Sequence, residues 1–184
     1  MRFRRRSIIT FGSCLLILIP ILCHGASIYD EEGNWSREYV TEAPAWKEQQ
    51  AELPAWPDPG RLLEVTVNRA NFPFRVYLDP ESLSIGEDRV LRYTVVVVSA
   101  SGARNISFEG IRCGQRSYRR YAYGAGAAWV PLSDEPWRPL LEDGMDSYRY
   151  VLYRDYLCDL TNPFQKVEDV LRRIRYSRGA GIVE

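Results

Sequence analysis

Arginine and tyrosine side chains gather between residues 112 and 123, and their chemistry suits the binding of an anion. Guanidinium groups bind carboxylate or phosphate through two parallel hydrogen bonds, and tyrosine rings stack on sugars or on arginines. The sequence therefore predicts a ligand surface for an anionic glycan, made of Arg112, Arg116, Tyr118, Arg119, Arg120, Tyr121 and, further along, Trp129. The alternative is a solvated strand face on which these residues pair with carboxylates such as Glu64 or Glu109.

Glu109 is the carboxylate with the best claim to a catalytic role. Held partly buried in a strand, it is a candidate general acid for hydrolysis of a glycan, with Asp79 or Asp155 as the second carboxylate. The alternative is a structural salt bridge from Glu109 to Arg112 or Arg116. Because no spacing fixes a carboxylate pair, no catalytic residue is assigned.

The first 25 residues have the pattern of an export signal: a cationic start, an apolar run over residues 8–22, and small residues from Gly25 onward. We expect cleavage to leave a periplasmic protein. One alternative is a retained anchor, but an apolar run of about 15 residues is shorter than the roughly 20 that span a bilayer. The other is a membrane-anchored lipoprotein that begins at Cys23.

Cleavage would remove His24, the single histidine, together with Cys14 and Cys23. The two remaining cysteines, Cys113 and Cys158, are expected to form one disulfide in an oxidising compartment. Without imidazole, a cysteine nucleophile has no histidine base, and a zinc site of thiolates and imidazoles is excluded for one chain. We therefore expect no metal and no cofactor.

The charge balance also limits the expected partners. The signal takes four arginines with it, so 24 basic residues become 20, against 24 acidic residues. Nucleic-acid-binding domains are usually basic, so nucleic acid is not an expected partner. An envelope protein or an anionic glycan fits better, and no membrane span is expected after cleavage.

Residues 26–60 form an acidic segment with recurring proline and tryptophan, which we call the strap. Its composition favours extended or disordered chain, yet its three tryptophans need apolar contacts. We expect Trp46 to Trp56 to lie against the folded domain, with a short helix over residues 47–52. The alternative is an exposed strip that binds a partner.

From residue 62 onward, apolar residues recur at every second position, as in strands with one buried face. The pattern predicts extended segments over residues 62–67, 74–78, 82–85, 91–98, 106–113, 116–123 and 127–132. The segment 91–98 is apolar on both sides at its end and should be central. A bulge at Glu109-Gly110 would place Ile106, Phe108, Ile111 and Cys113 on one face.

Helical spacing returns after Asp146 or Ser147, either of which is a suitable cap. A last helix is expected to start at Thr161-Asn162-Pro163. The sequence thus predicts an α+β fold: a mainly antiparallel sheet of about six strands backed by two C-terminal helices, in a single domain over residues 61–178 that follows a signal peptide and the strap.

The stretch RYTVVVVSASGARNISFEGIRCGQRSYRRYAYG, with Trp129, LYRDYLC and the earlier LPAWPDP and YLDPESLSIGEDRVLRY, resembles the cryptic neisserial protein one-like family of bacterial envelope proteins. The similarity runs from Trp46 to about Leu160. It implies a Gram-negative periplasmic or membrane-associated location, and it supplies no catalytic residues.

Together these observations favour a non-catalytic periplasmic domain that binds or supports another envelope component. A carboxylate-dependent hydrolase of cell-wall or surface glycan, with Glu109 as its acid, is the alternative. A small-molecule carrier is a third hypothesis, and it would need an enclosed apolar pocket.

Overall fold

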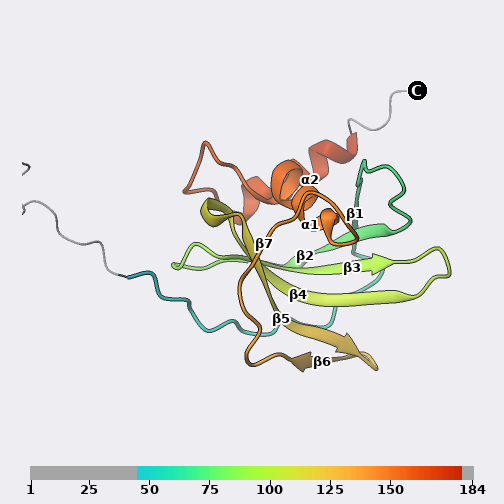
Figure 1. Cartoon of the computed structure of the whole chain (residues 1–184), viewed down its shortest axis with the longest axis horizontal. Coiled ribbons are helices and arrows are strands. Elements are labelled where there is room, and N and C mark those ends of the chain that lie inside the picture. The colour runs from blue at the N-terminus through green and yellow to red at the C-terminus, as the bar shows by residue number, and fades with distance from the viewer. Residues whose placement is uncertain (1–44, 180–184) are drawn as a thin grey trace, which may run out of the picture. The chain divides into compact units, whose positions relative to one another are not determined.

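The computed structural model of the chain describes residues 45–179, in which an antiparallel sheet carries helices on one face (Figure 1). The strands lie side by side in chain order: β1 (Leu63–Val65), β2 (Arg75–Ile85), β3 (Leu91–Val98), β4 (Arg104–Arg112), β5 (Ser117–Ala125) and β6 (Ala128–Pro131). A two-residue strand, β7 (Arg138–Pro139), pairs with β5. The predicted signal peptide and residues 26–44 of the strap lie outside the described residues.

The helical layer follows the sheet in the chain. A 3-10 turn, η2 (Cys113–Gln115), leads out of β4, and after β7 come α1 (Ser147–Val151), a π-helical turn η3 (Leu152–Leu157) and α2 (Val167–Gly179). The last helix packs on β1, β2 and η3. The main core lies between this layer and the sheet; its fully buried members include Leu78, Tyr93, Val95, Ile111, Leu152, Leu157 and Ile174. The predicted α+β fold is confirmed.

Residues 45–58 of the strap run along the opposite face of the sheet (Figure 1). A smaller apolar cluster lies there, formed by Phe108, Tyr121 and Ala122 with Ala51 and Trp129 packed against it. Both faces of the central strands are therefore covered. This explains why β3 is buried along its whole length except at Val97, which is half-buried.

The short helix expected over residues 47–52 is wrong, because this part of the strap is extended. Its backbone groups bond to the sheet instead of to one another. The Gln49 N–H donates to Asp88 Oδ2 at 2.9 Å, and its carbonyl oxygen accepts from Arg92 Nη2 at 2.9 Å. These partners take the place of the hydrogen bonds that a helical turn would have made.

The bulge expected at Glu109-Gly110 is also wrong. The register of β3 with β4 runs without interruption, and the irregularity lies between β4 and β5, where Tyr121 is the extra residue. Phe108 therefore faces the strap and Ile111 faces the helices. Side chains of β4 continue to alternate between the two faces of the sheet. Because both faces are covered, an apolar residue can lie on either face, so Phe108 and Ile111 are both buried although they point in opposite directions.

Two element boundaries also differ from expectation. The two segments expected over 74–78 and 82–85 form one strand, β2, which begins at Arg75 and whose register with β3 shifts between Asp79 and Ser84. The last helix begins at Val167 instead of at residue 163. The carboxylate of Asp159 accepts the N–H groups of residues 161 and 162, and this local bonding holds the segment in turns.

No helix within residues 45–179 has the length and apolar character needed to cross a bilayer.

Candidate functional site

A disulfide joins the turn that follows β4 to the end of η3. Cys113 in η2 and Cys158 just after η3 have their Cα atoms 5.6 Å apart and are separated by 45 positions in the chain. This is the disulfide expected from the sequence. In the chain-entropy account, closing a loop of this length stabilises the fold by about 4 kcal/mol.

Glu109 points from β4 into the helical side of the sheet, where its side chain is 0% exposed. Arg149 from α1 donates two parallel hydrogen bonds to it, from Nη2 to Oε1 at 2.7 Å and from Nε to Oε2 at 2.8 Å. Ser107 Oγ donates to Oε1 at 2.6 Å, and the Tyr93 hydroxyl donates to Oε2 at 3.0 Å. Four donors therefore satisfy a carboxylate that solvent does not reach.

Other groups extend this buried cluster. Arg149 also pairs with Asp146, whose side chain is 60% exposed, and its guanidinium lies over the rings of Tyr118 and Tyr148 at 4.5 and 4.6 Å. Burial, together with the negative charge of Glu109, raises the pKa of Tyr93 well above its ordinary value of 10.0. The phenol therefore stays protonated and keeps donating to Glu109.

The salt bridge expected from Glu109 to Arg112 or Arg116 is wrong, since the partner is Arg149. The proposed second carboxylates are engaged elsewhere. Asp79 accepts the N–H of residue 81 within β2, and Asp155 pairs with the neighbouring arginine at the surface. Neither is among the hydrogen-bond partners of Glu109.

On the opposite face, Glu48 of the strap collects three donors from the sheet side. Arg119 Nη1 donates to Oε2 at 2.9 Å, Trp137 Nε1 donates to the same oxygen at 3.0 Å, and the Tyr121 hydroxyl donates to Oε1 at 2.7 Å. Burial, followed by the hydrogen bond to Glu48, raises the pKa of Tyr121. The Glu48 carboxylate thus attaches the strap to a group of cationic and aromatic side chains on the sheet side.

Tryptophans hold the strap on either side of Glu48. The guanidinium of Arg112 lies 3.6 Å from the ring centre of Trp46 and 5.6 Å from that of Trp137. Further along, Trp129 Nε1 donates to the Pro54 carbonyl oxygen at 2.9 Å, and its ring lies 5.2 Å from that of Trp56. Four members of the predicted ligand surface, on β4, β5 and β6, are therefore contacts for the strap: Arg112, Arg119, Tyr121 and Trp129.

The other three members lie on the helical side. Tyr118 is buried beneath Arg149. Arg120 donates to Glu135 at 2.8 Å, and this hydrogen bond lowers the pKa of Glu135. Arg116 pairs with Glu142 at 3.2 Å in an exposed position. The structure divides the predicted surface between the two faces of the sheet, because neighbouring residues of a strand point in opposite directions.

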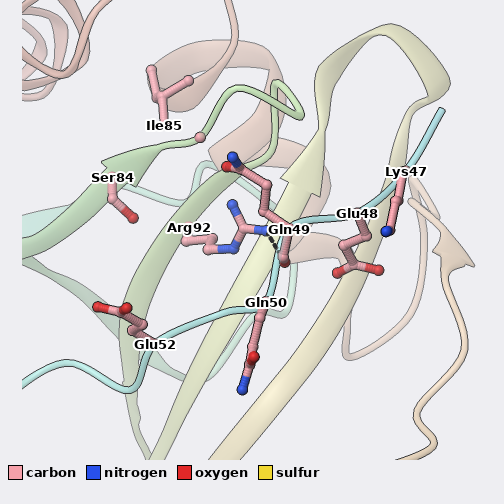
Figure 2. Close-up of a pocket in the computed structure, with 9 residues that line it drawn as sticks. Lys47, Glu48, Gln49, Gln50, Glu52, Ser84, Ile85 and Arg92 are labelled. Atoms are coloured by element: carbon pink, nitrogen blue, oxygen red, sulfur yellow. Dashed lines mark hydrogen bonds between the residues drawn. The ribbon is translucent and has the colours of Figure 1, made fainter. Parts of the chain in front are cut away.

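An open cavity of about 850 Å³ lies where the strap crosses the end of β2 (Figure 2). The guanidinium of Arg92 reaches the strap here and donates to the Gln49 carbonyl oxygen at 2.9 Å. It also donates to the two carboxylate oxygens of Asp88, at 2.6 Å to Oδ2 and 3.2 Å to Oδ1. Although burial opposes ionisation, these hydrogen bonds and two backbone N–H donors lower the pKa of Asp88. Arg92 is thus already neutralised by Asp88, although it lines the cavity.

Sequence reasoning missed Glu48 and Arg149 as partners of the predicted residues. Glu109 shares its alternation with Ser107 and Ile111, and this spacing was the available signal that its side chain faces the helices. It also missed Arg75, Tyr77 and Arg104, which lie around a smaller pocket beyond the strap.

Within the described residues, no three histidine, cysteine, aspartate or glutamate side chains gather as a metal site would require.

Comparison with known proteins gives one family match. The family model described as the CNP1-like family matches residues 41–175, which span the described part of the strap, the whole sheet and most of α2. No curated protein matches the chain, and no solved structure matches it.

Proposed function

The chain belongs to the CNP1-like family, as the resemblance in its sequence predicted, and on that premise we propose that it is an exported envelope domain that binds or supports another envelope component without catalysing a reaction. Residues 1–25 would direct export to the periplasm of a Gram-negative cell, with lipid attachment at Cys23 as the alternative. The Cys113–Cys158 disulfide supports an oxidising compartment.

The environment of Glu109 carries the non-catalytic part of this proposal. A general acid must approach the leaving group of its substrate and change protonation state during the reaction. Glu109 has no exposed surface and accepts four hydrogen bonds, two of them from the guanidinium of Arg149. These contacts suit a carboxylate that pairs with Arg149 and holds α1 on the sheet, and they leave no face for a glycosidic oxygen.

The location is tested by mass spectrometry of the protein from a cell-envelope fraction. The expected mature chain begins near residue 26, or at a lipidated Cys23, and has no free thiols at Cys113 and Cys158. An intact Met1 on a cytoplasmic chain with two free thiols would contradict export.

The binding function is tested by in-cell crosslinking, comparing the native chain with a variant in which Glu109→Leu and Arg149→Met replace the ion pair by apolar groups. Such replacement of a buried pair often preserves the fold, unlike removal of one partner. We expect both proteins to capture the same envelope component and to leave the glycan fragments of the cell unchanged. Fragments that appear with the native chain and disappear with the folded variant would instead establish a hydrolase.

A further inference from the structure

A second polar surface lies where the strap leaves the sheet, around the adjoining ends of β2, β3 and β4. A pocket of about 290 Å³ opens there, with Arg75, Tyr77 and Arg104 around it and with Val96 and Val98 as its floor. The two valines are buried, at 2% and 8% exposure, whereas both arginines are exposed. The pocket therefore combines a firm apolar base with cationic side chains that solvent reaches.

The strand register explains why the two arginines flank one position. Val98 of β3 pairs with Arg75 on one side and with Arg104 on the other. Directly paired residues point to the same face of a sheet, so both arginines project on the side of the strap. With neighbouring strands about 4.8 Å apart, their Cα atoms lie about 10 Å from each other. This spacing leaves room for an anion between two long side chains.

The charges around this pocket are not balanced within the described residues. No carboxylate lines it, and neither Arg75 nor Arg104 forms an ion pair in that part of the chain. Glu64 lies opposite Tyr77 in the β1–β2 register and so shares this face, yet it pairs with neither arginine. In contrast, Arg116, Arg119 and Arg120 each have a carboxylate partner.

Tyr77 supplies a flat surface beside the cations. Its ring is half-buried and lies 5.8 Å from the guanidinium carbon of Arg75, within the range of a cation–π contact. A sugar ring places its C–H face on an aromatic side chain of this kind and on aliphatic floors such as Val98. The lining thus contains one part suited to an anion and another suited to the ring that carries the anion.

We propose that this pocket binds an acidic sugar unit, with its carboxylate or phosphate between Arg75 and Arg104 and its ring on Tyr77 and Val98. This proposal rests on the binding function proposed above, and it adds the chemical class of the ligand and the location of the binding site. The anionic glycan expected from the sequence is retained, but it binds at the strand ends instead of along residues 112–121. Bidentate pairing with two guanidinium groups supplies the affinity, so binding weakens as salt concentration rises.

The test is an NMR titration of the mature, disulfide-bonded protein with glucuronate, glucose 6-phosphate and uncharged glucose. We expect the two charged sugars to shift the amide signals of β2, β3 and β4 near the pocket, and glucose to bind at least about tenfold more weakly. Equal binding of glucose and glucuronate would contradict the proposal.

Variants locate the site. Arg75→Gln and Arg104→Gln should each weaken glucuronate binding about tenfold, because each removes a charged hydrogen-bonding group. Glu64→Gln should strengthen binding severalfold by removing a repulsive charge from the same face. Arg116→Gln makes the same charge change at an exposed arginine elsewhere and should leave binding unchanged. Equal weakening by Arg116→Gln and Arg75→Gln would show attraction by overall charge and overturn the site.

Phosphatidylglycerol vesicles separate a sugar from a lipid headgroup. Arginine-dependent binding to these vesicles without binding to either charged sugar would overturn the sugar assignment. The sugar-binding proposal and the broader binding function can be contradicted independently. If the native chain binds neither sugar yet crosslinks to an envelope component, this site is wrong and the proposed function stands.

Discussion

Arg149 and Glu109 meet through two parallel hydrogen bonds of 2.7 and 2.8 Å, with side chains that are 7% and 0% exposed. Arg149 belongs to α1 and Glu109 to β4, so this pair fixes the first helix on the middle of the sheet. Removing one partner of such a pair is strongly destabilising, because the other charge stays buried. Replacing both partners by apolar groups costs much less, because no buried charge remains.

Glu109→Gln should therefore lower the free energy of unfolding by about 3 to 5 kcal/mol, because the buried Arg149 charge keeps only the exposed carboxylate of Asp146 as a counter-charge. Urea denaturation of the purified, disulfide-bonded protein measures this change. Glu142→Gln is the matched control, since it breaks an exposed pair with Arg116 and should cost at most about 1 kcal/mol. Similar losses in the two variants would mean that Glu109 is not buried with its arginine.

Gly110→Ala should destabilise the sheet by about 1 to 3 kcal/mol through overpacking. An added Cβ atom would lie 2.8 Å from the Tyr121 ring and 2.8 Å from Val90, and Tyr121 is held there by its hydrogen bond to Glu48. Thermal unfolding measures the loss. Gly114→Ala is the control, since a Cβ atom there meets nothing within 4 Å. A stable Gly110→Ala protein would contradict the close approach of Tyr121.

Gly124→Ala should loosen the strap, because its Cβ atom would lie 2.6 Å from the Trp56 ring. Lys47 and Lys166 are the two lysines of the chain, so a lysine-specific protease reports on the strap through one bond and on the domain through the other. Cleavage after Lys47 should quicken by about tenfold if the strap loses about 1.4 kcal/mol of attachment. Unchanged cleavage at Lys47, or equal acceleration at Lys166, would contradict a local effect.

Asp88 should make stability fall in acid. Burial alone would raise the pKa of Asp88, but the hydrogen bonds that its carboxylate accepts from Arg92, Gln49 and Val90 lower this pKa below the ordinary 3.8. The ionised carboxylate therefore stabilises the fold fully above pH 3.8, and this contribution is lost as pH falls through the pKa of the folded protein. Asp88→Asn should be less stable at neutral pH, and its deficit should shrink below pH 3.8. Urea unfolding over this range measures the deficit.

Asp79 provides the opposite case. Burial raises its pKa above 3.8, so its contribution to stability is present in acid and is lost as pH rises through the folded value. Asp79→Asn should gain stability relative to the native chain as pH increases, while Asp88→Asn loses it. Parallel profiles for the two variants would contradict this assignment.

The sequence predicted well the features that depend on local periodicity. Alternating residues such as those of β3 showed the central strand, and the elimination of the other cysteines led to Cys113 and Cys158. Both signals depend on the residues themselves and need no knowledge of what lies opposite.

The sequence did not reveal which segments cover each face of the sheet. Glu48 and Arg119 lie 71 positions apart and Glu109 and Arg149 lie 40 apart, so no local pattern links them. The phase change at Gly110 looked like a bulge because one buried face was assumed. With the strap on one face and helices on the other, apolar residues change sides along an unbroken strand, and the extra residue belongs to the neighbouring strand at Tyr121.

The two margins of the sheet are short. On one side β1 offers three residues. On the other, β6 offers four and β7 two, and they end at Pro131 and Pro139, which have no N–H to donate. A strand from another molecule would find few backbone groups to join at either margin, so growth of the sheet by addition of further chains is disfavoured. For the exported domain proposed above, margins of this kind would protect the chain from association while it folds outside the cytoplasm.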